Sequence, residues 1–462
     1  MTSQTYTIGM FHYQVGRTDG VSLEMDKWRR VLEDTGHTVH YAAGDLGSAK
    51  GTLIPEMYHH TAEAERLHAN TFIALRDYPS EAEYRQSLYG LTDVIEEKFR
   101  CWVVENDIDF LIPQNVWSVA VNPAVAIAVT RVMRDLKLPA LAHNHDFYWE
   151  RVDGVALTCG TAMEFVDKYI PPHDETARHA VINSLAQREL AERKGVQARV
   201  VPNVFDFAAP PWQPDSYNAD FRARIGLRDK DVMILQATRV VARKGIELAV
   251  DLVQALDTPY CRAQFQRLGM YDGRAFDEDS RIVLVLAGYV RDDITEAYVR
   301  RLKQKVKQTG IDAIFIGDLI GHERRQEGVQ KIYSLWDAYV YADFVTYPSW
   351  WEGWGNQLLE AVRAKLPIAL FEYPVYLVDI KDSGFQVISF GDQIQGRDAQ
   401  GLIQVSPDII AAAADQTVEL LTDSQLREDI VEHNFQVAAL HYSLPALQEH
   451  LQALMDSFGE DS

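Results

Sequence analysis

An alternation of short apolar strands and amphipathic helices occurs twice along this sequence, on either side of a proline-rich stretch at 208–217. Near the N-terminus, TYTIGMF from Thr5 predicts a strand, a helix follows and ends at Gly36, and 37–42 predicts a second strand. Two strands joined through a helix in one sheet run parallel to each other. We therefore expect an α/β protein with two doubly wound domains.

The same patterns define the expected elements and domain boundaries. In the first half, further strands are expected at 109–113, 139–143 and 198–202, with helices at 123–136 and 177–194. In the second half, strands are expected at 232–237, 282–287, 313–316, 344–347 and 367–371, with helices at 246–256, 295–309 and 357–364. The predicted domains are an N-terminal domain over 1–208 with a two-helix insertion at about 54–104, a C-terminal domain over 218–430, and C-terminal helices over 431–462.

Length and charge narrow the class of protein. A chain of 462 residues is longer than one hydrophobic core usually organises. Its formal net charge of −22 repels phosphate backbones and anionic lipids, so we expect no nucleic acid and no membrane as partner. The three cysteines form no disulfide framework, and the N-terminus has no leader pattern. These features predict a cytoplasmic protein, and they are compatible with a homo-oligomer.

The segment from Thr346 to Val362 (TYPSWWEGWGNQLLEAV) combines a strand end, a glycine-flanked turn and a helix start. Glu352 lies in the turn, and Glu360 lies on the second turn of a helix that is expected to begin near Asn356. Two carboxylates at different depths of a pocket can each accept hydrogen bonds from a pair of sugar hydroxyls, and a helix start favours a diphosphate. The alternative is a plain acidic helix start, with Glu352 as a dipole cap and Glu360 facing solvent.

A second junction between strand and helix, QATRVVARKGI at 236–246, carries a basic cluster in an acidic chain. Its basic residues are Arg239, Arg243 and Lys244, and Gly245 follows them. Cations at the carboxyl edge of a parallel strand lie where a phosphate group would bind. The alternative is a surface cluster that balances nearby acids, but the position of the junction favours phosphate binding.

Histidines end a strand of the first half at 143–146 (HNHD). His-x-His followed by Asp146 would also suit a metal, but no further ligand is evident, so we expect neither a metal nor another cofactor. His145 can instead position a sugar hydroxyl by hydrogen bonding. Gly16 and Gly20 do not form the G-x-G-x-x-G pattern of dinucleotide-binding proteins, and they either shape a loop or let an anion approach a helix N-terminus.

Acidic pairs of the D-x-D type occur at 107–109, 229–231 and 277–279. Such pairs can be mistaken for cation sites, but the first precedes a strand and the other two fall in polar loops. We expect all of them to be solvated acids.

Several of these segments together resemble the retaining, nucleotide-sugar-dependent glycosyltransferases of family 4. They are Arg239 with Lys244-Gly245, the run PSWWEGWG at 348–355 that continues to Glu360-Ala361, Val201-Pro202-Asn203, Gly36-His37 with Val39, and Tyr442-Ser443. The likeness covers most of the chain. It implies the GT-B architecture, in which two Rossmann-like domains face a cleft and the last helix returns to the first domain.

The resemblance also implies a role for particular residues. Glu360 would hold the nucleotide ribose, and Glu352 would lie near the transferred sugar. Arg239 and Lys244 would neutralise the diphosphate leaving group, the electrostatic contribution that usually dominates such a reaction. His145 would lie beside the sugar and Gly20 near the phosphates. Glu352 and the residues that follow it would complete the donor site: Gly353, Trp354, Gly355 and Asn356.

The chain departs from the family pattern at a few positions. Val204 stands where a glycine is usual, Lys365-Leu366 replaces Ala-Gly, and Asp19-Gly20 replaces two glycines. The bulky pair Trp350-Trp351 either walls the sugar pocket or packs in the core.

The resemblance predicts transfer of a hexose from a nucleotide sugar to a hydroxyl, with retention of configuration and without a metal. The alternatives are a nucleotide-sugar epimerase on the same fold and a catalytically silent nucleotide-sugar-binding subunit. No basic face dominates 54–104, so a soluble acceptor is expected: a small sugar, a glycerate-like polyol acid or a free glycan.

Overall fold

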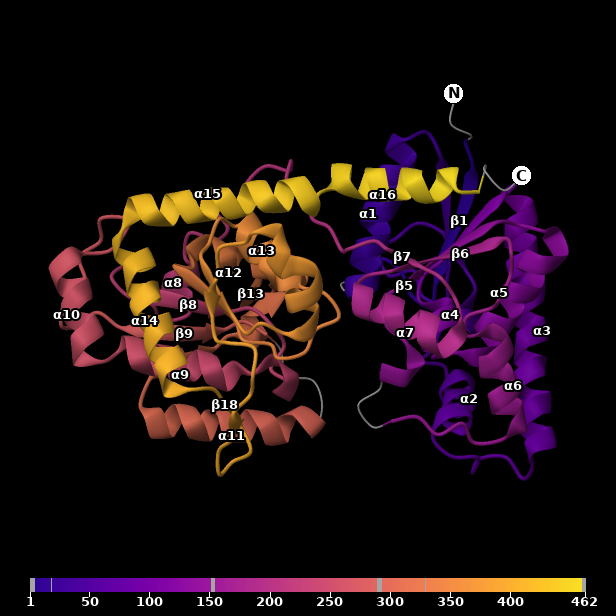
Figure 1. The fold of residues 1–462 in the computed structure, drawn as a ribbon, viewed down its shortest axis with the longest axis horizontal. Helices are drawn as coiled ribbons and strands as arrows, with labels where there is room; N and C mark the ends of the chain where they lie inside the picture. Colours follow the sequence, from indigo (N-terminus) through magenta and orange to yellow (C-terminus); the bar gives the residue numbers. More distant parts are fainter. Residues whose placement is uncertain (1–4, 18, 151–153, 289–292, 329, 459–462) are drawn as a thin grey trace. The chain divides into compact units, whose positions relative to one another are not determined.

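The computed structural model describes residues 5–17, 19–150, 154–288, 293–328 and 330–458 (Figure 1). The chain forms two compact units. Unit 1 comprises Met1–Val204 and Leu444–Ser462, and unit 2 comprises Phe205–Ser443. The chain therefore passes from one unit to the other twice.

Unit 1 is built on a parallel sheet whose strand order is β3-β2-β1-β4-β5-β6-β7 among the described residues. Its strands are β1 (Thr7–His12), β2 (Thr38–Ala43), β3 (Thr52–Leu53), β4 (Phe110–Pro113), β5 (Ala140–Asn144), β6 (Ala177–Val181) and β7 (Arg199–Val200). Strand β1 lies between β2 and β4, with Ile8 opposite Val39 on one side and Phe110 on the other. This is the order in which the chain reverses direction across the sheet, as in nucleotide-binding doubly wound folds.

Helices cover both faces of this sheet (Figure 1). They are α1 (Gly20–Asp34), α2 (Ala62–Phe72), α3 (Glu81–Glu105), α4 (Val116–Val119), α5 (Pro123–Leu136), α6 (Gly160–Tyr169), α7 (Ser184–Lys194) and α16 (Leu444–Asp456). Asp19 starts α1 by accepting a hydrogen bond from the backbone N–H of Ser22, and Pro123 occupies the first position of α5. At these two helix starts, one residue accepts a hydrogen bond from a free backbone N–H group and the other has no N–H group to satisfy.

Helices α2 and α3 occupy the expected insertion. Buried residues of α3 recur at helical spacing, and α3 packs along α5: Tyr84, Leu88, Leu91, Ile95, Phe99 and Trp102. The opposite face of α3 carries its charged residues, so the polar stretch is an amphipathic helix of the core and not a separate module.

The C-terminal helix α16 belongs to unit 1 and packs on α1 (Figure 1). Leu447, Leu451 and Leu454 lie in the same buried cluster as Trp28 of α1 and Ile8 of β1. The preceding helix, α15 (Ser424–His441), belongs to unit 2. Only the last helix therefore returns to the first unit, whereas the sequence placed the return from residue 431 onward.

Unit 2 repeats the same topology, with the strand order β10-β9-β8-β14-β15-β16 among the described residues. Its strands are β8 (Val232–Gln236), β9 (Ile282–Leu286), β10 (Asp312–Phe315), β14 (Phe344–Tyr347), β15 (Ile368–Leu370) and β16 (Ile388–Ser389). Its helices are α8 (Phe221–Arg224), α9 (Ile246–Leu256), α10 (Pro259–Leu268), α11 (Asp293–Thr309), α12 (Leu335–Tyr341), α13 (Asn356–Arg363), α14 (Pro407–Thr422) and α15. A small sheet of β11 (Ile320–Gly321), β12 (Arg325–Glu327) and β13 (Gln330–Ser334) precedes α12, and β17 (Gly396–Arg397) pairs with β18 (Ile403–Gln404).

Two elements differ from the sequence predictions. The expected helix at 177–194 is the buried strand β6 followed by α7, because Asn183 caps a helix start inside the segment by accepting a bond from Ala186 N at 2.7 Å. The proline-rich stretch at 208–217 lies within unit 2 and is not a free linker. Its Trp212 ring stacks on Trp336 with centroids 3.8 Å apart, so an aromatic anchor fixes a segment that lacks regular hydrogen bonds.

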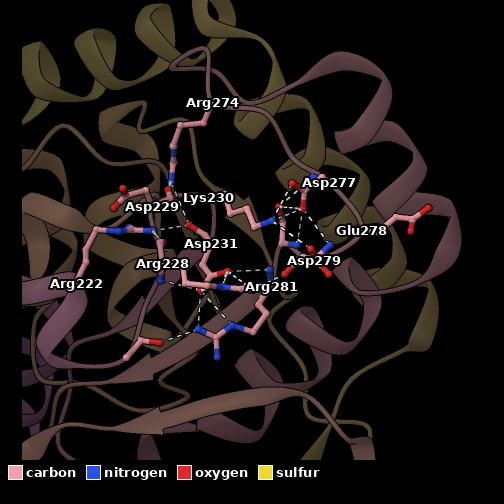
Figure 2. Close-up of polar contacts among 12 residues, drawn as sticks. Arg222, Arg228, Asp229, Lys230, Asp231, Arg274, Asp277, Glu278, Asp279 and Arg281 are labelled. Atoms are coloured by element: carbon pink, nitrogen blue, oxygen red, sulfur yellow. Dashed lines mark hydrogen bonds and ion pairs between the residues drawn. The ribbon is translucent and has the colours of Figure 1, made fainter.

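An ion-pair network surrounds the amino ends of β8 and β9, and it corrects one expectation (Figure 2). Asp231 is fully buried, and its carboxylate accepts bonds from the guanidinium groups of Arg228 at 2.9 Å and Arg281 at 2.6 Å. The prediction that all the D-x-D residues are solvated acids is therefore wrong for Asp231. A single sequence shows the acids of such a network but not the arginine of the neighbouring strand that pairs with them.

Candidate active site

The carboxyl ends of two neighbouring strands mark the same place in each unit. The strand order reverses between β1 and β4 in unit 1 and between β8 and β14 in unit 2. In open α/β sheets, ligands bind beyond the carboxyl ends of the strands at this reversal. In each unit, the residues that follow these strands are therefore placed where a ligand would bind.

In unit 2, the loops after β8 and β14 bring two cations to one carboxylate. Nη1 of Arg243 lies 2.8 Å from Oε2 of Glu352, and Nζ of Lys244 forms an ion pair with Oε1 of the same residue. The side chains of Lys244 and Glu352 are each 10% exposed. Lys244 of the basic cluster is therefore not a solvated surface charge, because it is buried against Glu352.

Charge and burial act together on this pair. Burial alone would raise the pKa of Glu352, but Lys244 and Arg243 outweigh it and hold the pKa below its ordinary value. Burial lowers the pKa of the Lys244 ammonium, and Glu352 opposes that effect. The Glu352 carboxylate thus stays ionised and pairs with two cations, so the three groups together keep a net positive charge.

Glycine at 245 allows the two loops to approach each other. Its φ of +55° is left-handed, and a Cβ atom there would lie 2.4 Å from the carbonyl oxygen of Pro348 in the loop after β14. Any larger residue would push that loop away. The Lys244-Gly245 pair therefore combines a cation with the backbone conformation that brings it to Glu352.

Helix α13 places the second carboxylate. Glu360 lies on its second turn, and its Oε2 accepts a hydrogen bond of 2.9 Å from the hydroxyl of Tyr339 on α12. The helix begins at Asn356, and its N-cap Gly355 supplies no side-chain cap. A Cβ on Gly355 would lie 2.4 Å from the Tyr373 hydroxyl, which explains a glycine here without any ligand.

The remaining predicted donor residues surround this turn. Gly353 is half-buried, and Trp354 is buried with its ring 5.6 Å from that of Tyr442. Arg239 is exposed and follows β8, where its charge contributes to lowering the pKa of Lys244. Trp351 is 38% exposed, so core packing does not explain it.

In unit 1, His145 follows β5 and is held by the residues that follow β4. Its backbone N–H donates to Oδ1 of Asn115 at 2.7 Å, and its Nε2 lies 3.3 Å from Oε1 of Gln114. The same Oε1 lies 2.9 Å from Nδ1 of His143. Burial lowers the pKa of His145 to about 3, so the ring is neutral near pH 7.

Gly20 is the exposed first residue of α1, directly after its cap. The carboxylate of Asp19 accepts bonds from Ser22 N at 3.0 Å and from Nε2 of Gln14 at 2.9 Å. The departure from two glycines thus has a structural reason, because Asp19 caps the helix. Gly16 has φ of +65° and lies against the backbone of Ala49, so it shapes the loop.

Within the part of the chain that the structure describes, no group of three or more His, Cys, Asp and Glu side chains could hold a metal ion. His143 and His145 instead share Gln114. None of the described helices is long and apolar enough to cross a membrane.

Comparison with known proteins identifies the family. Residues 218–437 match the family model described as glycosyl transferases group 1. The mannosylglucosylglycerate synthase of Petrotoga mobilis is 37% identical to this chain, over 90% of the chain and 94% of that protein. The chain belongs to the group 1 glycosyltransferases. The mannosylglucosylglycerate synthase of Thermotoga maritima is 36% identical to this glycosyltransferase, over 96% of the chain and 98% of that protein.

A solved structure shares the fold of this glycosyltransferase. The crystal structure of a glycosyltransferase from Rickettsia africae has a TM-score of 0.61 and 12% identity, over 99% of this chain and 100% of that chain. The predicted α/β architecture with two Rossmann-like domains and the predicted membership of this glycosyltransferase family are confirmed.

Sequence analysis missed several residues of the two strand-end regions. In unit 1 these are His12, Gln114 and Asn115, and in unit 2 Tyr339. Gln114 and Asn115 follow β4 directly, so the rule that polar residues after parallel strands line a site would have found them. No local pattern marks Tyr339, because it reaches Glu360 from another helix.

Proposed function

We propose that this glycosyltransferase moves a hexosyl group from a nucleoside-diphosphate sugar to a hydroxyl group of a small soluble glycosylated polyol acid, with retention of configuration. The proposal rests on the cations at the carboxyl edge of unit 2: the buried Lys244 and the half-buried Arg243, with Arg239 on the same loop. Departure of a nucleoside diphosphate builds negative charge, and preorganised cations stabilise such charge without a metal.

Glu352 has two states in this proposal. Without donor, its carboxylate neutralises Lys244 and Arg243. When the donor binds, its diphosphate provides the alternative anion, and Glu352 is released to accept hydrogen bonds from hydroxyls of the transferred sugar. Glu360 accepts the ribose hydroxyls, and Tyr339 holds its carboxylate in place. The glycines at 353 and 355 and Trp354 shape the turn, while Gly20 leaves room near the phosphates.

The acceptor is proposed from two observations. The two relatives are mannosylglucosylglycerate synthases, and each aligns with nearly the whole chain. The chain carries a net charge of −22, and the helices of 54–104 present no basic face, which favours a soluble acceptor over one embedded in an anionic membrane. A hexosylglycerate, with glucosylglycerate as the first choice, fits the relatives and the charge. The family 4 resemblance supports retention of configuration, and three cysteines without a disulfide framework support a cytoplasmic location.

The test is a donor and acceptor matrix with the purified full chain. GDP-, UDP- and ADP-hexoses are each incubated with glucosylglycerate, glucosylglycerol, glycerate and a lipid extract, and products are identified by mass spectrometry. We expect a hexosyl-glucosylglycerate whose new bond has the donor's anomeric configuration by NMR. Appearance of a donor epimer indicates the epimerase, binding without product indicates a silent subunit, and product on lipid only contradicts the soluble acceptor.

A further inference from the structure

The end of strand β1 carries a hydrogen-bonding group that the proposed function has not used. His12 is the last residue of β1 and is 7% exposed. Its Nδ1 lies 2.6 Å from the backbone carbonyl oxygen of Gln114, the residue after β4. A carbonyl oxygen only accepts hydrogen bonds, so Nδ1 carries the hydrogen. In the neutral ring, Nε2 therefore holds a lone pair and acts only as an acceptor.

The surroundings keep this ring neutral. Burial lowers the pKa of His12 to about 4, although Asp19 and the carbonyl of Gln114 oppose that effect. Three other segments carry the titratable groups that interact with His12: Asp19 caps α1, His145 follows β5 and His59 follows β3. Lys27 of α1 acts on the neighbouring His145. Burial would raise the pKa of Asp19, but the hydrogen bonds that its carboxylate accepts from Ser22 and Gln14 lower it, so Asp19 is ionised.

Nε2 of His12 is available to a ligand. Among the residues that the structure describes, this nitrogen has no hydrogen-bond partner, and it does not belong to the fully enclosed unpaired atoms. The neighbouring Asp19 carboxylate also only accepts. The hydrogen-bond partner of Nε2 must therefore supply a hydrogen, as a hydroxyl does and an ionised carboxylate or phosphate oxygen does not.

We propose that Nε2 of His12 accepts a hydrogen bond from a sugar hydroxyl of the acceptor, which makes the end of β1 a subsite for the neutral part of that substrate. The inference rests on the proposed function, because it supposes a hydroxyl-bearing acceptor. His12 is then a specificity residue that recognises a hydroxyl group. The carboxylate of a glycerate moiety binds at another place.

The tautomer is tested directly by NMR. Full-length protein labelled with 15N-histidine gives long-range proton–nitrogen correlations that distinguish a ring with hydrogen on Nδ1 from one with hydrogen on Nε2. His12→Gln assigns the His12 signals, and His40→Gln on β2 is the matched control. At pH 7 we expect a neutral ring with hydrogen on Nδ1, whose Nε2 signal shifts when glucosylglycerate is added. Hydrogen on Nε2, a charged ring, or no shift at saturating glucosylglycerate overturns the proposal.

Kinetics separate the hydroxyl from the carboxylate. His12→Phe should raise the KM for glucosylglycerate and for uncharged glucosylglycerol by the same factor of about three to ten, the effect of losing one neutral hydrogen bond. The KM for the donor should not change, and His12→Gln, which keeps an amide near the position of Nε2, should restore part of the loss. Thermal unfolding confirms that each variant is folded.

The outcomes distinguish the two proposals. An unchanged acceptor KM in a folded His12→Phe protein, or an effect on glucosylglycerate alone, overturns the His12 subsite while leaving the proposed function intact. Failure of the wild-type protein to form product from any donor and acceptor overturns the proposed function. In that case, the NMR signal of His12 with glucosylglycerate still decides whether the subsite binds a polyol.

Discussion

Units 1 and 2 share a sheet topology but differ in the side chains at its strand reversal. In unit 2 the loops after β8 and β14 bring the half-buried Arg243 and the buried Lys244 into ion pairs with Glu352. In unit 1 the ends of β1, β4 and β5 bring together neutral groups, with Gln114 between His12 and His145. The same place in the fold is thus prepared for charge in one unit and for hydroxyl groups in the other.

The sheet topology therefore determines where a ligand binds, and the side chains at that place determine which chemical groups can bind. A diphosphate leaving group needs preorganised cations, and burial makes each cation more effective. A polyol needs hydrogen-bond acceptors and donors without net charge, which neutral imidazoles and amides provide.

Acid should unfold unit 1 before unit 2. Burial lowers the pKa of His12, His59 and His179 to about 4 and that of His145 to about 3, whereas an unfolded chain protonates its histidines near pH 6.5. The unfolded state therefore binds more protons between pH 6.5 and 4, and the stability of unit 1 is full above 6.5 and falls as pH drops through that window. Each of the three fully buried imidazoles, His12, His145 and His179, contributes up to about 3 kcal/mol, and the half-buried His59 contributes less because solvent screens it.

The measurement is hydrogen exchange, corrected for the intrinsic rate and resolved by peptide, at pH 7, 5.5 and 4.5. Peptides of β1 and β5 should lose protection first. In unit 2, Arg281 and Arg228 hold the pKa of Asp231 well below its usual range against the effect of burial, so that contribution is lost only below about pH 4. Loss of protection in unit 2 at a higher pH than in unit 1 would contradict this prediction.

Lys244→Ala should have the next largest effect. It removes a buried cation and leaves Glu352 with Arg243 alone. We expect kcat/KM to fall by about 10²–10³-fold, the usual cost of losing one preorganised charge partner in an active site. The matched control is Lys305→Ala, which breaks the ion pair between Lys305 of α11 and the half-buried Asp251 of α9, two residues that belong to no part of the proposed donor site. Its turnover per folded molecule should stay at the wild-type level, and a Lys244→Ala enzyme within threefold of wild type would sink the assignment.

Asp231→Asn should weaken unit 2 without affecting catalysis. The variant leaves Arg228 and Arg281 without their buried carboxylate, which we expect to cost about 3 kcal/mol of the free energy of unfolding. Urea unfolding measures it, with Asp229→Asn as control because Asp229 is exposed. Equal stability of the two variants would show that the network at the amino ends is not structural.

Tyr339→Phe should give a smaller, donor-specific effect. It removes the hydroxyl that donates to Glu360 at 2.9 Å and keeps the ring in place. Losing one hydrogen bond to a carboxylate should raise the KM for the donor by about tenfold and leave the KM for the acceptor unchanged. Tyr341→Phe is the control, because on the same helix its hydroxyl bonds Asn218. If both variants behave alike in initial-rate assays, Tyr339 does not position Glu360.

Excess EDTA should have no effect on turnover. The cations of Arg239, Arg243 and Lys244 already supply the positive charge that a metal would provide. Rates with and without the chelator are compared after dialysis. A complete loss of turnover that Mg²⁺ or Mn²⁺ reverses would show that the cations of unit 2 are not sufficient for the reaction.

The parts of unit 2 that sequence predicts well are those with strong local patterns. Strand β14 and helix α9 have the predicted bounds, because a short buried run and an apolar helix face are both visible in the residues themselves. Two closely spaced glycines predicted the turn from Gly353 to Gly355, and the run of basic residues predicted Lys244 as a phosphate-binding residue. These signals need no knowledge of distant residues.

The parts that sequence missed depend on tertiary pairing. Strand β6 looks helical because ARHAV has no alternation, and its position between β5 and β7 decides its conformation. Nδ1 of His12 contacts a carbonyl oxygen 102 residues away in the sequence, and this contact leaves Nε2 as the acceptor. The buried carboxylate of Asp231 pairs with an arginine 50 residues away. No window of neighbouring residues contains that information.

The return of α16 to unit 1 has a consequence for synthesis on the ribosome. Unit 1 is translated first, yet Leu447, Leu451 and Met455 belong to the same buried cluster as Met25 and Trp28. At translation rates of about 5–20 residues per second, all of unit 2 must emerge over roughly 10–50 s before those side chains exist. The half that emerges first is therefore completed last, and the apolar face of α1 stays uncovered by α16 until then.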